Sequence, residues 1–346
     1  MNSFSAEILR WFRENGRDLP WRETKDPYAI WLSEIILQQT RIVQGWEYWE
    51  RFMQTYPKVE DLAAASEDDV LKLWQGLGYY SRARNLHTAA KQIVALGAFP
   101  NTLEGIKSLK GVGDYTAAAI GSFAFDIPAA VVDGNVYRVL SRYFGIDTPI
   151  NSTQGKKEFA ALAQSLLPAS DAASYNQGMM DFGAIQCSPQ SPKCLLCPLA
   201  ETCEALRCGR VEELPVKNKT VKVKTRHLSY IYIRCKSSAA DDTGKSEPMV
   251  AIHRRGEGDI WQGLWEPYNV SDVKELPSFV KNPILLAKDV KHVLTHRILL
   301  ADFYLLETES RPPLPDDYIW IRESEIEDYG VPRLIEIMLE KIIPAE

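Results

Sequence analysis

The sequence predicts a two-domain protein, mainly α-helical over residues 1–210 and of mixed α and β character over 227–346. Before residue 210, apolar residues recur at three- and four-residue spacing, as in 70–77 and 159–166, which is typical of amphipathic helices. After residue 226, short runs rich in β-branched and aromatic residues, such as 227–235 and 301–308, indicate strands. The basic segment 211–226 between them is either a solvated linker or a strap along a phosphate backbone.

Composition and charge narrow the class of protein. A chain of 346 residues can form two domains with a sizeable core. Its net charge of −6 does not indicate nucleic-acid binding, so any DNA contact must come from local patches. The sequence shows neither a signal-peptide pattern nor an apolar run of membrane-spanning length. We therefore expect a cytoplasmic, nucleoid-associated protein without membrane contact.

The first segment of interest is "WLSEIILQQT", residues 31–40, which predicts a helix. Glu34 lies here among Ile35, Ile36 and Leu37. An apolar setting raises the pKa of a carboxyl group and keeps a protonated fraction near neutral pH. A glutamate on a helix is ordinarily a solvated surface residue, so the residue alone leaves both interpretations open.

A glycine turn and a helix follow in "SLKGVGDYTAAAIGSFAF", residues 108–125. Gly111 and Gly113 can adopt backbone angles that other residues avoid. The Ala-rich stretch from Thr116 predicts a helix, whose first amides would be unpaired and would point forward. Such a turn suits a phosphate. Tyr115 lies at its tip, either packed or in a polar role.

The next segment, "VVDGNVYRVLSRYFG", residues 131–145, begins with an acidic residue. Asp133 precedes an apolar-periodic run that predicts a helix, so it is expected to cap that helix. An ionised carboxylate held in this way could also stabilise a positive charge.

The cysteines give the most specific signal. Four of the six cysteines, Cys187, Cys194, Cys197 and Cys203, follow the pattern C-x6-C-x2-C-x5-C. A disulfide framework is not expected without a secretory signal. Zinc sites usually contain two C-x2-C pairs, and only one is present. One compact four-cysteine loop favours a [4Fe-4S] cluster over zinc.

Together, these motifs resemble a known family. The hairpin, the cysteine spacing and 131–145 are similar to the helix-hairpin-helix DNA glycosylases of the endonuclease III superfamily. Residues 19–41 and 74–86 resemble the adenine DNA glycosylases, the MutY family, and 253–268 resembles their C-terminal domain. The resemblance implies a six-helix barrel with an iron–sulfur lobe in 1–210, carrying the cluster loop at 187–203, and a Nudix-like lesion-recognition domain in 227–346.

The resemblance also implies an activity. It assigns adenine excision to Glu34 as proton donor and Asp133 as electrostatic stabiliser, with Tyr115 beside them. Bifunctional relatives have a lysine at the position of Tyr115, whose amine forms a Schiff base. A phenol cannot do so. We therefore expect a monofunctional glycosylase that removes adenine opposite 8-oxoguanine or guanine, and the alternative is an endonuclease III-type glycosylase and abasic-site lyase.

Recognition residues follow from the same resemblance. The expected substrate is double-stranded DNA with an 8-oxoguanine:adenine mispair, bound by a monomer. The adenine pocket would be formed by Arg17, Trp21, Arg22 and Gln177. The residues expected to enter or contact the duplex are Gln39, Thr40, Leu77, Gly78 and Tyr79. The hairpin glycines Gly111 and Gly113 would bind a DNA phosphate.

The C-terminal half would read the opposite base. The family uses a short loop of an aromatic, a serine and a histidine, and "VLTHRI", residues 293–298, corresponds to it. Thr295 keeps the hydroxyl and His296 the imidazole, whereas Leu294 departs from the aromatic. Residues 227–346 lack the REx-x-EE run of Nudix hydrolases, so we expect binding rather than hydrolysis there. A non-enzymatic iron–sulfur carrier or damage binder would need neither the hairpin nor the paired carboxylates.

Overall fold

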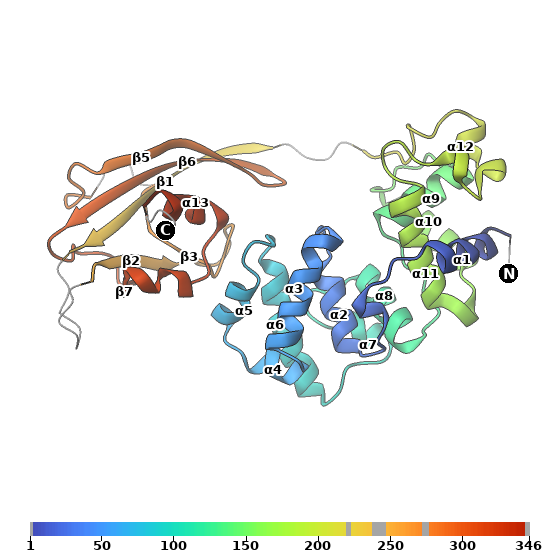
Figure 1. The fold of residues 1–346 in the computed structure, drawn as a ribbon, viewed down its shortest axis with the longest axis horizontal. Helices are drawn as coiled ribbons and strands as arrows, with labels where there is room; N and C mark the ends of the chain where they lie inside the picture. The colour runs from blue at the N-terminus through green and yellow to red at the C-terminus, as the bar shows by residue number, and fades with distance from the viewer. Residues whose placement is uncertain (1–2, 219–222, 237–246, 272–276, 343–346) are drawn as a thin grey trace. The chain divides into compact units, whose positions relative to one another are not determined.

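The computed structural model describes residues 3–218, 223–236, 247–271 and 277–342 (Figure 1). Residues 219–222 of the expected basic linker lie outside the described residues. The chain forms two compact units, Met1–Ala64 with Asn85–Lys219, and Ala65–Arg84 with Thr220–Glu346. The second unit therefore includes a segment of the helical half, which a single division near residue 210 does not give.

The first unit is helical, as the apolar spacing predicts. Its helices are α1 (Ser3–Asn15), α2 (Pro27–Ile36), α3 (Ile42–Thr55), α4 (Val59–Ala64), most of α6 (Ser81–Leu96), α7 (Leu103–Lys107), α8 (Asp114–Phe125), α9 (Gly134–Phe144), α10 (Thr153–Leu166), α11 (Ala172–Asp181) and α12 (Glu204–Arg207). Short turns of helix add η1 (Pro20–Arg22), η2 (Ala169–Asp171), η3 (Phe182–Gln186), η4 (Cys194–Leu196) and η5 (Ala200–Thr202).

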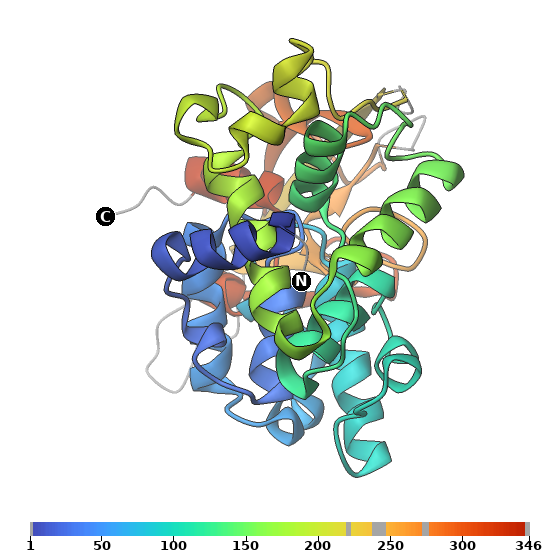
Figure 2. The ribbon, with the colours of Figure 1, turned by 90° about the vertical axis from the view of Figure 1, so that its right-hand side faces the viewer.

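Apolar faces of these helices pack into core clusters, two of which hold the helices that carry the candidate site. One cluster joins α1, α9, α10 and α11 around buried residues such as Ile8, Leu140 and Phe159. The other joins α2 and α8 around Ile30 and Ala119. In Figure 2, α1 in dark blue lies against α11 in yellow-green. These packed helices fix the positions of the helix ends that carry the candidate site.

Two of the helices begin at aspartate caps. The Asp26 carboxylate accepts a hydrogen bond of 3.0 Å from the Tyr28 amide, and Pro27 occupies the first position of α2. Asp133 caps α9 in the same way, which confirms the expected cap. Helix α2 ends at Ile36, so the helix expected for 31–40 is shorter than predicted, and Gln39 lies in a turn.

The second unit is built on a mixed sheet. Its strands are β1 (Lys224–Cys235), β2 (Met249–Arg254), β3 (Trp265–Glu266), β4 (Tyr268–Asn269), β5 (Ile284–Val293), β6 (Arg297–Thr308) and β7 (Tyr318–Arg322). The order is β3-β2-β1-β6-β5, with β4 paired to β1 and β7 to β2. Strands β1 and β6 run parallel, and β5 and β6 form an antiparallel hairpin.

Helices complete the second unit, and one of them, α5, comes from a part of the sequence far from the strands. The C-terminal helix α13 (Arg333–Ile342), preceded by the turn η6 (Glu323–Asp328), packs on the sheet through Leu334, Ile335 and Met338. Helix α5 (Glu67–Leu73) belongs to the same unit, where Glu67 accepts a hydrogen bond from Arg254 at 2.8 Å. Among the described residues, no helix has the length and apolar character needed to cross a membrane.

Candidate functional site

Glu34 is buried in the first unit. It lies on α2, and its exposed fraction is 7%. Burial raises its pKa to about 7, helped by the negative charge of Asp133 and opposed by the Tyr115 hydrogen bond and by Arg22. A large fraction of this carboxyl group therefore carries its proton at neutral pH.

Tyr115 lies directly beside this carboxyl group. Its Oη donates a hydrogen bond of 3.1 Å to Glu34 Oε2 from the first turn of α8. Burial and the charge of Glu34 raise the pKa of Tyr115 well above its ordinary value, so the phenol stays neutral and remains a donor. The polar interpretation of Tyr115 thus has a partner, and donation to Oε2 favours the ionised form of Glu34.

Asp133 forms the third corner of the site. Its Oδ1 accepts from the amides of Asn135 and Val136, each at 2.8 Å, and its Oδ2 accepts from Asn135 Nδ2 at 2.7 Å. Burial raises the pKa of Asp133, and these hydrogen bonds oppose the rise. The cap holds the carboxylate in one orientation, close enough for its charge to act on Glu34. Two carboxyl groups in different settings can divide acid and stabilising roles.

The two arginines expected in the adenine pocket meet a carboxylate that the sequence analysis did not single out. Arg17 Nε donates to Asp181 Oδ1 at 2.9 Å, and Arg22 donates to both oxygens of Asp181, at 2.8 and 2.9 Å. The Asp181 side chain is fully buried. Gln177 lies one turn earlier on α11 and is half-buried. Asp181 therefore fixes both guanidinium groups at the site.

Trp21 is buried beside this cluster. Its ring lies edge-on to Trp46 and Trp49, at centroid distances of 5.8 and 5.6 Å. The structure thus gives Trp21 a packing role, while the turn η1 connects it directly to Arg22.

The glycine hairpin joins α7 to α8. Gly111 has φ +80°, and a Cβ there would lie 2.7 Å from the Cβ of Asn85, so only glycine fits. Gly113 is exposed and precedes α8 without a side-chain cap. The first turn of α8 thus has no side-chain cap for its amides, an arrangement that suits a phosphate.

Two exposed residues expected to enter the duplex share an unusual backbone conformation. Gln39 has φ +58° and Tyr79 has φ +48°, a region that non-glycine residues rarely occupy. Thr40 follows in the same turn. Such conformations often mark functional positions, because the surrounding structure must hold them.

In the loop around Tyr79, the side chains expected to contact DNA differ in exposure. Tyr79 is 46% exposed, whereas Leu77 is buried at 8%. Trp74 Nε1 and Arg82 Nη2 donate to the Gly78 carbonyl at 3.0 and 3.2 Å. These bonds hold the loop, so Tyr79 rather than Leu77 is the projecting side chain.

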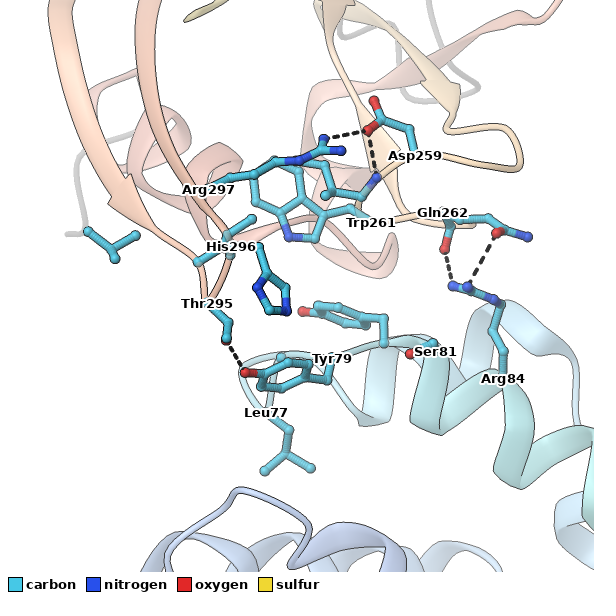
Figure 3. Close-up of a pocket in the computed structure, with 15 residues that line it drawn as sticks. Leu77, Tyr79, Ser81, Arg84, Asp259, Trp261, Gln262, Thr295, His296 and Arg297 are labelled. Atoms are coloured by element: carbon cyan, nitrogen blue, oxygen red, sulfur yellow. Dashed lines mark hydrogen bonds and ion pairs between the residues drawn. The ribbon is translucent and has the colours of Figure 1, made fainter. Parts of the chain in front are cut away.

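The Thr295–His296 turn closes the hairpin between β5 and β6. Leu294 and Arg297 exchange backbone hydrogen bonds of 2.8 and 3.4 Å, which leaves Thr295 and His296 exposed at the tip. A pocket in the second unit, called here the Tyr79 pocket, is lined by 77–81, Arg84, 259–262 and 293–297 (Figure 3). Tyr79 Oη is hydrogen-bonded to Thr295 Oγ1 in it.

The four cysteines of the spaced run line one cavity. Cys187, Cys194, Cys197 and Cys203 share it with Arg142, whose Nη1 donates to Cys187 Sγ at 3.5 Å. Within the described ranges, no three His, Cys, Asp or Glu side chains are placed to hold a single metal ion. The structure thus brings the four cysteines of the predicted ligand set to the wall of one cavity.

Comparison with known proteins follows this geometry. Residues 32–168 match the HhH-GPD superfamily of base excision DNA repair proteins, and residues 244–341 match the NUDIX domain. The adenine DNA glycosylase of Buchnera aphidicola from Acyrthosiphon pisum is 32% identical over 353 residues, covering 97% of this chain and 97% of that protein. The chain belongs to the adenine DNA glycosylases.

Further comparisons are consistent with membership of this family. The human adenine DNA glycosylase is 41% identical over 225 residues, which cover 62% of this chain and 41% of that protein. A solved thermostable thymine-DNA glycosylase covers 59% of this chain and 95% of its own, at a TM-score of 0.56 and 34% identity. An endonuclease III–DNA complex, at 22% identity and a TM-score of 0.52, supports the fold alone. The expected fold class and base excision activity of this glycosylase are thereby confirmed.

Two carboxylates of this glycosylase were missed by the sequence analysis. Asp181 stands between Met180 and Phe182, and Asp259 lies in the glycine-rich stretch before Trp261. A charged residue within an apolar stretch was the available signal for Asp181. For Asp259, Arg255 four positions earlier was the local signal, whereas Arg226 and Arg297 lie on the distant strands β1 and β6.

Proposed function

We propose that this glycosylase removes adenine from 8-oxoguanine:adenine and guanine:adenine mispairs by simple hydrolysis, without strand cleavage. The observation that carries the proposal is the buried Glu34 carboxyl group, which is protonated in part at neutral pH and is hydrogen-bonded to Tyr115. The family supports adenine as the base. The separate settings of Glu34 and Asp133 support the division of roles between them.

The proposed reaction proceeds in two steps. Glu34 donates its proton to N7 of the flipped adenine, and the C1′–N9 bond breaks with its electron pair leaving on the base. Asp133, held by its cap, stabilises the positive charge that develops on the sugar. Water then adds to C1′ and gives a proton to the Glu34 carboxylate, which restores the acid and leaves an abasic site.

Adenine recognition is proposed for the surface around Asp181. Gln177, one turn before Asp181 on α11, offers an amide that can pair with an adenine edge. Arg17 and Arg22, fixed by the buried carboxylate, and the packed Trp21 would form its wall. A phosphate of double-stranded DNA would bind the hairpin amides, and Gln39, Thr40 and Tyr79 would enter the duplex. One chain supplies every residue of this arrangement, so we propose a monomer.

The lyase alternative is tested by covalent trapping. Because Tyr115 has no amine, the native protein should give little borohydride-trapped complex, and abasic product should be cut only after alkali or heat. The variant Tyr115→Lys supplies an amine at the same position and serves as the positive control. Efficient trapping by the native protein would contradict the monofunctional assignment.

The opposite base is tested on matched duplexes. The variant Thr295→Ala with His296→Ala should lower the ratio of single-turnover excision rates on 8-oxoguanine:adenine over guanine:adenine by about 5- to 100-fold, the worth of one or two base-edge contacts. The control is Thr225→Ala with His227→Ala, which removes the same residue types from exposed positions of β1 outside the Tyr79 pocket. An unchanged ratio in the turn variant would assign recognition elsewhere.

We infer that the four-cysteine cavity holds a [4Fe-4S] cluster. Cys187, Cys194, Cys197 and Cys203 would each supply one thiolate, and Arg142 would donate a hydrogen bond to the Cys187 sulfur. Bound there, the cluster would hold the segment 187–203 together, because metal binding couples to folding. The base-removal steps use no group of this lobe.

The cluster is tested by metal content and colour. Purified protein should be yellow-brown with absorption near roughly 400 nm, and Cys203→Ser should lose that absorption together with iron. The matched control, Cys208→Ser, changes an exposed cysteine outside the cavity and should keep both. A colourless, active protein with stoichiometric zinc would overturn the inference.

A further inference from the structure

The strongest feature that the proposed function leaves unused is a carboxylate shared by three arginines in the second unit. Asp259 accepts from Arg226 Nη1 at 2.8 and 2.6 Å, from Arg255 Nη2 at 2.8 Å and from Arg297 Nη1 at 3.3 Å. The three arginines come from the start of β1, from the residue that follows β2 and from the start of β6. One side chain thus joins three separate segments of the sheet.

One of these segments carries the Thr295–His296 turn. Arg297 directly follows His296, and its side chain is 42% exposed. Figure 3 shows the hydrogen bond between Arg297 and Asp259, two residues that line the Tyr79 pocket. The backbone of the turn is also held, since the Lys224 amide donates to the His296 carbonyl at 3.2 Å. The Arg297–Asp259 ion pair therefore helps to fix the position of the Thr295–His296 turn next to Trp261.

The same carboxylate holds the opposite wall of the pocket. Asp259 Oδ1 accepts from the Ile260 amide at 2.7 Å, and Arg255 Nε donates to the Ile260 carbonyl at 2.9 Å. These bonds precede Trp261, a bulky residue at φ +61° that lines the pocket. A large aromatic residue in that region persists only where its surroundings hold it.

The negative charge of Asp259 holds the three arginine side chains together. Arg255 pairs with Glu266 as well as with Asp259, and Arg226 and Arg297 each pair with Asp259. Burial would raise the pKa of Asp259, but hydrogen bonds from Arg226 and the Ile260 amide lower it below its ordinary value. An asparagine there has one acceptor oxygen and no charge, so the guanidinium groups would repel each other and the more exposed Arg297 would turn toward solvent.

We propose that Asp259 is a positioning residue that sets both walls of the Tyr79 pocket, the Trp261 loop and the Thr295–His296 turn, and thereby the preference for the damaged opposite base. This inference rests on the proposed function of the turn. It adds a residue that contacts neither DNA strand in the proposal and acts through Arg297 and Trp261.

The test compares single-turnover excision on 8-oxoguanine:adenine and guanine:adenine duplexes. Asp259→Asn should lower the rate ratio about threefold or more, which is within the range of couplings in one ion-pair network. Asp259→Glu, which keeps the charge, should recover part of the ratio. Arg297→Gln changes an exposed partner and carries the test if Asp259→Asn does not fold; it should shift the ratio in the same direction.

The matched control is Glu323→Gln. Glu323 also pairs with an arginine of β1, Arg234, but at the other end of that strand and outside the pocket. It should leave the ratio unchanged. Equal losses on both duplexes in Asp259→Asn, or an equal ratio change in Glu323→Gln, would reduce Asp259 to a structural role and overturn the inference.

The turn variant separates this inference from the proposed function. If Thr295→Ala with His296→Ala lowers the ratio while Asp259→Asn and Arg297→Gln keep it, the turn reads the base and the inference about Asp259 is wrong. If the turn variant itself keeps the native ratio, the assignment of the turn fails and the inference fails with it.

Discussion

Replacing Glu34 with glutamine is expected to lower base excision by about 10² to 10⁴-fold, while DNA binding stays close to native. The amide has the shape of the carboxyl group and keeps an oxygen that can accept from Tyr115, but it has no proton to donate to adenine. Single-turnover rates and a binding titration on the same duplex measure the two effects. Glu47→Gln, at an exposed position of α3, is the control.

The pH dependence of the native enzyme belongs to the same prediction. Because the pKa of Glu34 is raised to about 7, its protonated fraction falls as the pH rises through that value. The excision rate should fall with it on the alkaline side. A Glu34→Gln enzyme with more than about a tenth of native activity would rule out Glu34 as the acid.

Replacing Asp133 with asparagine is expected to lower excision by about 10² to 10³-fold with little change in melting temperature. Asparagine caps a helix as well as aspartate does, and its oxygen can accept from the Asn135 and Val136 amides, so the cap is kept while the charge and the hydrogen bond from Asn135 Nδ2 are lost. Rates and thermal unfolding of the same preparation measure both effects.

Asp26→Asn provides the matched control for Asp133→Asn, because it makes the same change at the cap of α2. Its excision rate should stay near native. If Asp133→Asn loses less than about tenfold while folding normally, the negative charge at this position is not needed for departure of the base.

Much of the catalytic site could be predicted from local sequence. The cap at Asp133 depends on a short polar residue before an apolar-periodic run, and such signals act within one helical turn. The turn at Gly111 needs a positive φ, and the glycine at this position indicates it. The apolar neighbours of Glu34 left both a solvated and a buried position open, and the structure shows the buried one, with α2 packed into the core.

Other features depended on contacts between distant parts of the chain. Arg17 and Asp181 are 164 positions apart, so no local pattern could pair them. The end of α2 at Ile36 was not visible either, since apolar and helix-forming residues continue beyond it. Arg226 and Arg297 meet at Asp259 because β1 and β6 lie parallel and adjacent in the sheet.

The grouping of Ala65–Arg84 with Thr220–Glu346 has a consequence for how this protein can be divided. A cut after Lys219 would leave α5 in the wrong fragment, separated from Arg254 and from the Tyr329 carbonyl that Lys72 contacts at 3.4 Å. The apolar side chains of Val70 and Leu71, fully buried in the intact chain, would lose that cover. An autonomous version of the second unit therefore calls for a rearranged gene, in which a linker fuses 65–84 to the segment that begins at Thr220.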